Sequence, residues 1–267
     1  MKFFQGLVVR ESLMRLIRYL FGQETRYGIL EGDGVVALRA PPFEGLEPSG
    51  ERIPTDRVRL LAPCEPSKVV CIGLNYRDHA AEFGLPLPDE PMLFLKPSTS
   101  VIGPGQEIRH PECSRQVDYE AELAIVIGRP SFRIRREEAA SCILGYTCFN
   151  DVTARDLQAK DVQFTRSKSF DTFGPLGPWI ETSLNPVGLA VESFLNGQRR
   201  QCSNTRELVF DPFELVHFIS WVMTLHPGDV IATGTPAGVG PMRPGDRIEI
   251  RIEGIGSLVN TVAAWDV

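Results

Sequence analysis

The sequence predicts a β-rich α+β fold, built as a sandwich or a rolled barrel with few helices. Nine short runs rich in apolar and β-branched residues follow residue 67, and turns containing Gly or Pro separate them. Asn196-Gly197 stands between two of these runs, where it is a strong hairpin signal. Only one long helix is indicated. It begins at Asp211, with Pro212 at its first position and Glu214 at the capping-box position, and continues as FELVHFISWVMTL. Many strands with few helices disfavour a doubly wound α/β sheet.

The remaining elements follow in chain order. Residues 1–13 are interpreted as a leader or a mis-called start, because Met14 opens MRLIRYLFG, which alternates like a first strand. Short strands around the turn 31–34 predict a small N-terminal β domain over 14–62. A linker-like stretch, APCEPSK, leads into a larger domain at 67–267. Short helices are expected after Asn75 and after Asp151.

Composition excludes several function classes. The formal charge of −6 and the pI of about 5.4 argue against a nucleic-acid surface. No run reaches the roughly 18 apolar residues that a membrane span needs. The six cysteines form no CxxC pair, which favours reduced thiols in a cytoplasmic protein. The basic cluster Arg133, Arg135 and Arg136 is interpreted as a solvated strand-to-helix corner.

A carboxylate cluster is the most informative feature. Glu120 and Glu122 lie two residues apart in VDYEAELAIVI, so they share one face of a strand. Ala124 and Val126 continue that face into the core, where two like charges would be costly without a cation. Asp151 ends another apolar strand and adds a third carboxylate. Three carboxylates suit Mg²⁺, Mn²⁺ or Ca²⁺. The alternative is a solvated strand face, which Asp118 fits well.

A possible base lies in a short helix upstream. His79 and Glu82 are three residues apart and can meet on one helical face, where the carboxylate would orient the imidazole. Gly73 and Gly84 flank this segment and would let it move as a lid. A surface ion pair is the alternative.

Further polar groups follow Asp151. Arg155 and Gln158, again three residues apart, suit a substrate carboxylate, and Lys168 could add a point charge. For each of them a solvated side chain is the alternative. The Gly-rich stretch 232–240 matches no nucleotide-binding motif, and no G-x-S-x-G element is present. The other histidines, His110 in a loop, His217 and His226, are assigned structural roles.

Six ordered segments together resemble the fumarylacetoacetate hydrolase family. They are IGLNYRDHAAE, FLKPSTS, DYEAELAIVIG, GYTCFNDVTARDLQ, RSKSFDTFGPLGP and ATGTPAGVG. The resemblance covers residues 68–267 and implies a mixed β-sandwich roll, assembled as a homodimer. It also implies that Glu120, Glu122 and Asp151 hold Mg²⁺ or Mn²⁺. His79 and Glu82 then match a catalytic dyad, and Lys168, Arg155, Gln158 and Thr235 match substrate-contacting positions.

The reaction that follows is hydrolysis of a C–C bond in a small 2,4-dioxo acid of the acylpyruvate type, with His79 deprotonating water. An isomerase or decarboxylase acting on 2-hydroxy-dienoic or 2-oxo acids is the alternative enzyme. A silent metal-binding module and a metal-stabilised structural protein are the alternatives outside catalysis.

Overall fold

The computed structural model describes residues 14–265, so the predicted leader at 1–13 lies outside the described residues. A mixed sheet of 12 strands runs through the molecule in the order β4-β3-β2-β1-β14-β12-β11-β17-β6-β7, with β5 paired to β1 and β8 to β14. Its strands are β1 (Arg15–Phe21), β2 (Glu24–Glu31), β3 (Gly34–Leu38), β4 (Pro48–Pro54), β5 (Arg59–Leu60), β6 (Lys68–Gly73), β7 (Met92–Pro97), β8 (Val101–Ile102), β11 (Ala121–Ile127), β12 (Ile143–Asn150), β14 (Gly174–Glu181) and β17 (Val230–Ala232).

Two smaller sheets complete the strand-rich fold that the sequence predicts. One has five strands in the order β16 (Gln198–Asn204), β15 (Ala190–Leu195), β19 (Arg247–Ile252), β20 (Gly256–Ala264) and β9 (Glu107–His110). The other has three, in the order β13 (Thr153–Ala154), β10 (Val117–Tyr119) and β18 (Gly240–Met242). His110 therefore ends a strand, where it pairs with Ala264, and is not in a loop as predicted.

The side chains of β11 pack alternately into two hydrophobic clusters, one on each face of the main sheet. Leu123 and Ile125 pack in the cluster that also holds Ile250 of the five-stranded sheet. Ala124 and Val126 point the other way, into a second cluster on the opposite face of the main sheet. The alternation read from the sequence is thus correct, but both faces are buried. The segment is the centre of a sandwich.

Helices are few and short. They are α1 (Arg77–Phe83), α2 (Arg155–Lys160), α3 (Thr165–Lys168) and α4 (Pro212–Val222), with 3-10 turns η1 (Thr55–Arg57), η2 (Ser98–Ser100), η3 (Arg136–Cys142) and η4 (Thr205–Glu207). The Asp211 carboxylate caps α4 by accepting the amides of Phe213 and Glu214, both at 2.9 Å. The helix ends three residues earlier than the apolar run predicts, because Leu225 pairs with Ser131 in an isolated bridge.

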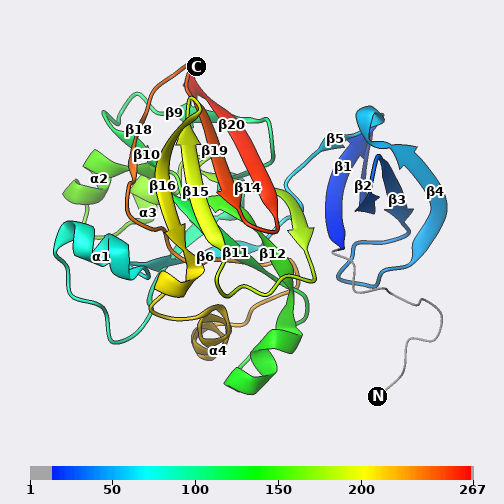
Figure 1. Ribbon diagram of the computed structural model, residues 1–267, viewed down its shortest axis with the longest axis horizontal. Helices are drawn as coiled ribbons and strands as arrows, with labels where there is room; N and C mark the ends of the chain where they lie inside the picture. The colour runs from blue at the N-terminus through cyan, green and yellow to red at the C-terminus, as the bar shows by residue number, and fades with distance from the viewer. Residues whose placement is uncertain (1–13, 266–267) are drawn as a thin grey trace.

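Strands β1–β5 stand apart from the smaller sheets in Figure 1, as expected for an N-terminal unit, yet β1 pairs with β14 of the main sheet. The division at 14–62 and 67–267 stays a prediction. Arg133 and Arg135 of the basic cluster precede η3, with Arg135 as its N-cap, and Arg136 is its first residue. All six cysteines are free. In the described part of the chain, no helix has the length and apolar character needed to cross a membrane.

A tight turn and a buried carboxylate each connect a pair of strands. Asn196 and Gly197 form the predicted β15–β16 hairpin, with φ values of 53° and 79° that an Asn-Gly pair tolerates. The buried carboxylate of Asp229 joins β17 to β6. It accepts bonds from the amide and hydroxyl of Ser67, the amide of His226 and the ammonium group of Lys68.

Candidate active site

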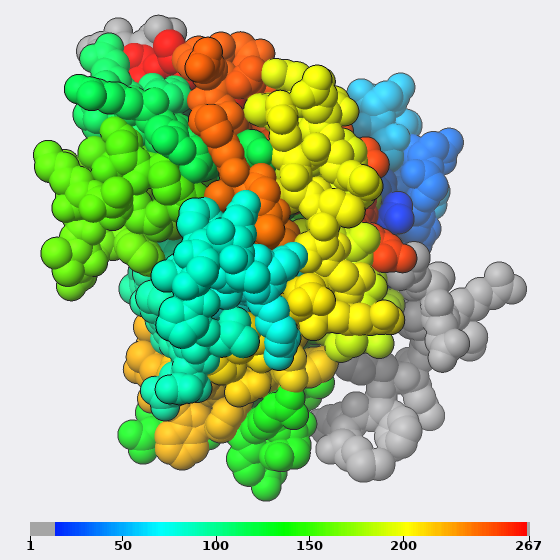
Figure 2. Space-filling view, turned by 60° about the vertical axis from the view of Figure 1, so that its left-hand side comes forward, coloured from blue at the N-terminus to red at the C-terminus, as the bar shows by residue number. Residues whose placement is uncertain are grey.

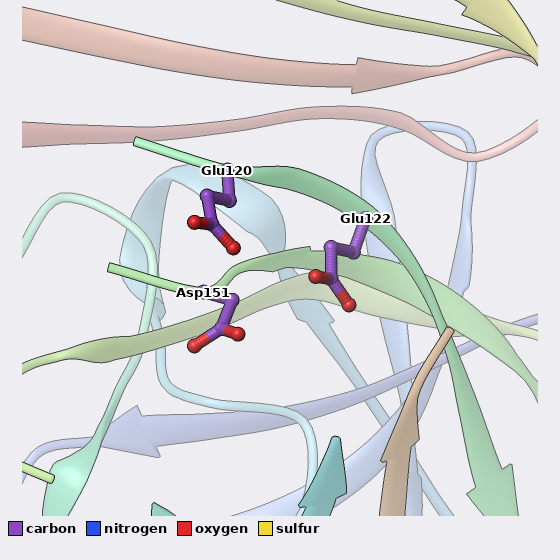
Figure 3. Close-up of side chains that lie close together, drawn as sticks. All are labelled: Glu120, Glu122 and Asp151. Atoms are coloured by element: carbon purple, nitrogen blue, oxygen red, sulfur yellow. The ribbon is translucent and has the colours of Figure 1, made fainter. Parts of the chain in front are cut away.

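Three carboxylates converge where two strands of the main sheet begin and end (Figure 3). Glu120, Glu122 and Asp151 are buried, and each offers an oxygen that lies within 4.8 Å of the others. The chain leaves one sheet at Glu120 and enters another at Ala121, so the run is two strands, not the single strand the spacing suggested. The Asp151 amide donates to the Glu120 carbonyl at 2.9 Å, which holds the two strand ends side by side.

Two lysines compensate this negative charge. Lys168 Nζ bridges Glu120 Oε2 at 2.8 Å and Asp151 Oδ2 at 2.7 Å. Lys96 Nζ lies 2.5 Å from Asp151 Oδ1 and is fully buried. Lys96 lies in the segment FLKPSTS, and no role was predicted for it from the sequence. The available signal was a lysine ending the apolar run MLFLK, a position where an unpaired ammonium would be costly.

The carboxylates differ in how their charge is balanced. Burial alone would raise the pKa of Glu120, but Lys168 and Arg155 outweigh it and lower the pKa to about 2. Burial, together with Asp151 and Glu120, raises the pKa of Glu122 well above its ordinary value. Glu122 accepts the Gly234 amide at 2.8 Å and, within the described chain, forms no ion pair. Glu122 is therefore the carboxylate that lacks a cation.

Arg155 is engaged in this cluster. Its Nε donates to Asp118 Oδ2 at 2.8 Å, one terminal nitrogen to Glu120 at 2.5 Å, and the other to Gln158 at 2.5 Å. The solvated alternative for Asp118 is wrong, because that side chain is buried against Arg155. A guanidinium group has five N–H donors, so two remain for a substrate once these three bonds are made.

His79 and Glu82 form the pair that their spacing predicts. His79 Nδ1 lies 3.2 Å from Glu82 Oε2. Glu82 also accepts the Gly238 amide, at 3.1 Å and 3.3 Å, which links α1 to the Gly-rich loop. With Nδ1 donating to the carboxylate, Nε2 is left as a proton acceptor. Figure 2 shows the α1 segment in cyan lying against the chain near residue 200 in yellow and near 240 in orange.

Thr235 lies in the Gly-rich loop, as its motif suggested. Its hydroxyl donates to the Ala121 carbonyl at 3.0 Å and accepts from Gln201 Nε2 at 2.8 Å. Gln201 is buried and also accepts the Ala121 amide at 3.0 Å, so it fastens the loop to the start of β11. Sequence reasoning missed Gln201, because nothing in β16 marks one glutamine as buried.

One cavity of about 380 Å³ collects these groups. Of the predicted site residues, Glu82 alone is not on its wall, since it stands behind His79. The wall carries His79, Glu120, Glu122, Asp151, Arg155, Gln158, Lys168 and Thr235, and its apolar part includes Ile72, Leu74, Phe83, Leu85, Met92, Phe94 and Phe164. The cavity wall thus combines charged and apolar side chains.

The donor set fits a hard divalent cation. All three candidate ligands are carboxylates, which Mg²⁺ and Mn²⁺ prefer. Counting every group as ionised, four acids face three cations, and Glu122 holds the excess negative charge. The acids are Asp118, Glu120, Glu122 and Asp151, and the cations are Lys96, Arg155 and Lys168. A bound divalent cation would compensate the Glu122 charge and change the net charge of the cluster from −1 to +1.

Comparisons with known proteins identify the family. Residues 68–263 match the family model described as fumarylacetoacetate (FAA) hydrolase C-terminal, and residues 14–63 match Rv2993c-like, N-terminal. The chain is 40% identical over 290 residues to oxaloacetate tautomerase YisK of Bacillus subtilis, covering 98% of this chain and 96% of that protein.

Two solved structures share the fold. One is 5-carboxymethyl-2-hydroxymuconate delta-isomerase from Mycobacterium smegmatis, with a TM-score of 0.89 and 46% identity over 94% of this chain and all of the other. The second is maleylpyruvate hydrolase from Sphingobium, with a TM-score of 0.80 and 34% identity over the same shares. These matches confirm the β-rich roll expected from the sequence. The chain belongs to the fumarylacetoacetate hydrolase family.

Proposed function

We propose that this protein is a tautomerase or isomerase that moves a proton at the carbon beside the keto group of a small 2-oxo acid. The observation that carries the proposal is one cavity whose wall holds both the carboxylate cluster and the oriented His79. Two relatives support proton transfer over hydrolysis, since one is named a tautomerase and the other an isomerase.

Glu120, Glu122 and Asp151 would hold the cation, Mg²⁺ or Mn²⁺. When bound, it supplies Lewis-acid stabilisation of negative charge on the substrate's oxygens. Lys168 uses two of its three N–H groups on Glu120 and Asp151, which leaves one for the oxygen that becomes negative.

His79 would carry the proton. Its Nε2 is free to accept the proton from carbon and to return it at another position, while Glu82 stabilises the imidazolium. Gln158 accepts from Arg155 through its carbonyl oxygen, so its amide hydrogens remain for the substrate carboxylate. Thr235 can donate to that carboxylate only if its bond to Ala121 opens.

Hydrolysis of an acylpyruvate is the second candidate. The same His79–Glu82 pair can deprotonate water, and a maleylpyruvate hydrolase shares the fold. Decarboxylation of a 2-oxo acid uses the same negatively charged oxygen. The homodimer and the cytoplasmic location are proposals that rest on the family resemblance and the composition.

A side-by-side assay tests the proposal. Oxaloacetate tautomerisation and decarboxylation, isomerisation of a 2-hydroxy-dienedioate and acylpyruvate hydrolysis are each measured with Mg²⁺, Mn²⁺ or EDTA. We expect proton transfer to be fastest, to need the cation, and to be lost in both Glu120→Gln and His79→Ala. Glu192→Gln, on β15 and outside the cavity wall, serves as the control and should keep full activity. Proton transfer that persists in EDTA, or that His79→Ala leaves unchanged, would contradict the proposal.

A further inference from the structure

Lys96 holds Asp151 from the side away from the cavity. The residue lies in β7 opposite Val69 of β6, and its side chain is fully buried. Its ammonium group donates to Asp151 Oδ1 at 2.5 Å and to the Val152 carbonyl at 3.0 Å. Burying an ammonium group costs several kcal/mol before its partners are counted, so this placement needs a reason.

The two oxygens of Asp151 have different surroundings. Oδ1 is bound to Lys96, which is not on the cavity wall. Oδ2 is bound to Lys168, which is on that wall and also reaches Glu120. One oxygen of Asp151 is therefore committed to the protein interior, and the other lies on the side where a cation and a substrate would enter.

We propose that Lys96 is a positioning residue that keeps Asp151 a one-oxygen ligand, and that the carboxylate cluster consequently selects Mg²⁺ or Mn²⁺ over Ca²⁺. The inference rests on the cation site of the proposed function. Mg²⁺ takes six ligands at about 2.0–2.1 Å in strict octahedral geometry, whereas Ca²⁺ takes six to eight oxygens at about 2.3–2.6 Å and often binds both oxygens of one carboxylate. A carboxylate whose Oδ1 is held by the interior Lys96, and which offers only Oδ2 on the cavity side beside Lys168, suits the first ion and disfavours the second.

The ratio of two affinities measures this effect. In Lys96→Met, Asp151 Oδ1 loses its charged partner and the carboxylate is free to turn. Losing a positive charge shifts the affinities for Mg²⁺ and Ca²⁺ in the same direction, because both ions carry the same charge, so their ratio reports geometry. Lost outer-shell partners of metal ligands typically cost about tenfold or more in affinity. We expect this loss to fall mainly on Mg²⁺, so the preference for Mg²⁺ over Ca²⁺ should decrease. Mn²⁺ bound to the protein is followed by paramagnetic resonance, and Mg²⁺ and Ca²⁺ are titrated as competitors.

Lys68→Met is the matched control. Lys68, in the neighbouring strand β6, also pairs with a buried aspartate, Asp229, but neither residue lines the cavity. Its ion preference should equal that of the wild type. An equal loss of the preference for Mg²⁺ over Ca²⁺ in the two variants would overturn the proposal, because it would show a general destabilisation of the protein. An unchanged preference in a folded Lys96→Met variant would overturn it as well.

The wild-type protein provides a test that needs no variant to fold. Tighter binding of Mg²⁺ and Mn²⁺ than of Ca²⁺ supports the proposal, and equal or tighter binding of Ca²⁺ overturns it. Failure to bind any of the three ions would instead overturn the cation site itself, and with it the proposed function.

Discussion

Replacing Lys168 by methionine would remove the ammonium group that bridges Glu120 and Asp151, while leaving a side chain of similar length beside Phe94. Burial on its own lowers the pKa of Lys168, but the Asp151 and Glu120 carboxylates outweigh it and raise that pKa above its ordinary value. The lysine is therefore charged in the folded protein at neutral pH, and its loss leaves two buried carboxylates with less compensation.

The magnitude follows from the remaining partners. Breaking a buried ion pair costs about 3–5 kcal/mol of unfolding free energy. The lower end applies here, since Glu120 keeps Arg155 at 2.5 Å and Asp151 keeps Lys96 at 2.5 Å. For a protein of this size 1 kcal/mol corresponds to roughly 2–4 °C, so we expect the melting temperature to fall by about 6–12 °C in EDTA.

Thermal denaturation of the wild type and Lys168→Met, each in EDTA and with Mn²⁺, measures this difference. Mn²⁺ should reduce the difference in melting temperature between the wild type and Lys168→Met, because the cation supplies the positive charge that the lysine supplied. Arg199→Met breaks an exposed pair with Glu192 and should change the melting temperature by less than about 3 °C. A Lys168→Met variant that melts within about 2 °C of the wild type in EDTA would refute the reasoning.

Three further predictions concern other parts of the molecule. Burial would raise the pKa of Asp229, but hydrogen bonds from Lys68 and Ser67 outweigh it and lower that pKa. The ionised Asp229 therefore stabilises the fold fully above the pKa of an aspartate in the unfolded chain, about 3.9, and this contribution is lost as the pH falls through the lower folded pKa. Asp229→Asn should lower the free energy of unfolding, measured by urea denaturation at pH 7, by about 2 kcal/mol. The variant should also lose less stability than the wild type as the pH falls, and an equally steep loss in the variant would contradict this assignment. Gly145→Ala would place a Cβ atom 2.5 Å from the Glu181 carbonyl oxygen, and we expect a loss of about 3 kcal/mol or no folded protein; wild-type stability would exclude the clash. Glu82→Gln removes the charge that orients His79, so kcat should fall about tenfold or more with KM nearly unchanged, whereas unchanged kcat would remove Glu82 from the mechanism.

Much of the site could be read from local sequence patterns. His79 and Glu82 lie three residues apart, so the helix period alone brings them together. Glu120 and Glu122 converge as their spacing of two predicts, although Glu120 lies between two strands. The cap at Asp211 and the turn at Asn196-Gly197 likewise depend only on neighbouring residues. These features hold in the folded protein because their geometry is set within a few residues of the chain.

Other features depend on which segments pack together. Lys96 of β7, at the edge of the main sheet, meets Asp151 although it lies 55 residues earlier in the chain and three strands separate β7 from β12 in the sheet order. Gln201 reaches Ala121 from a different sheet, 80 residues later. The burial of Asp118 against Arg155 reversed its expected exposure for the same reason. A strand's period assigns a side chain to a face, but only the fold decides what covers that face, and hence which charges are buried and which partners balance them.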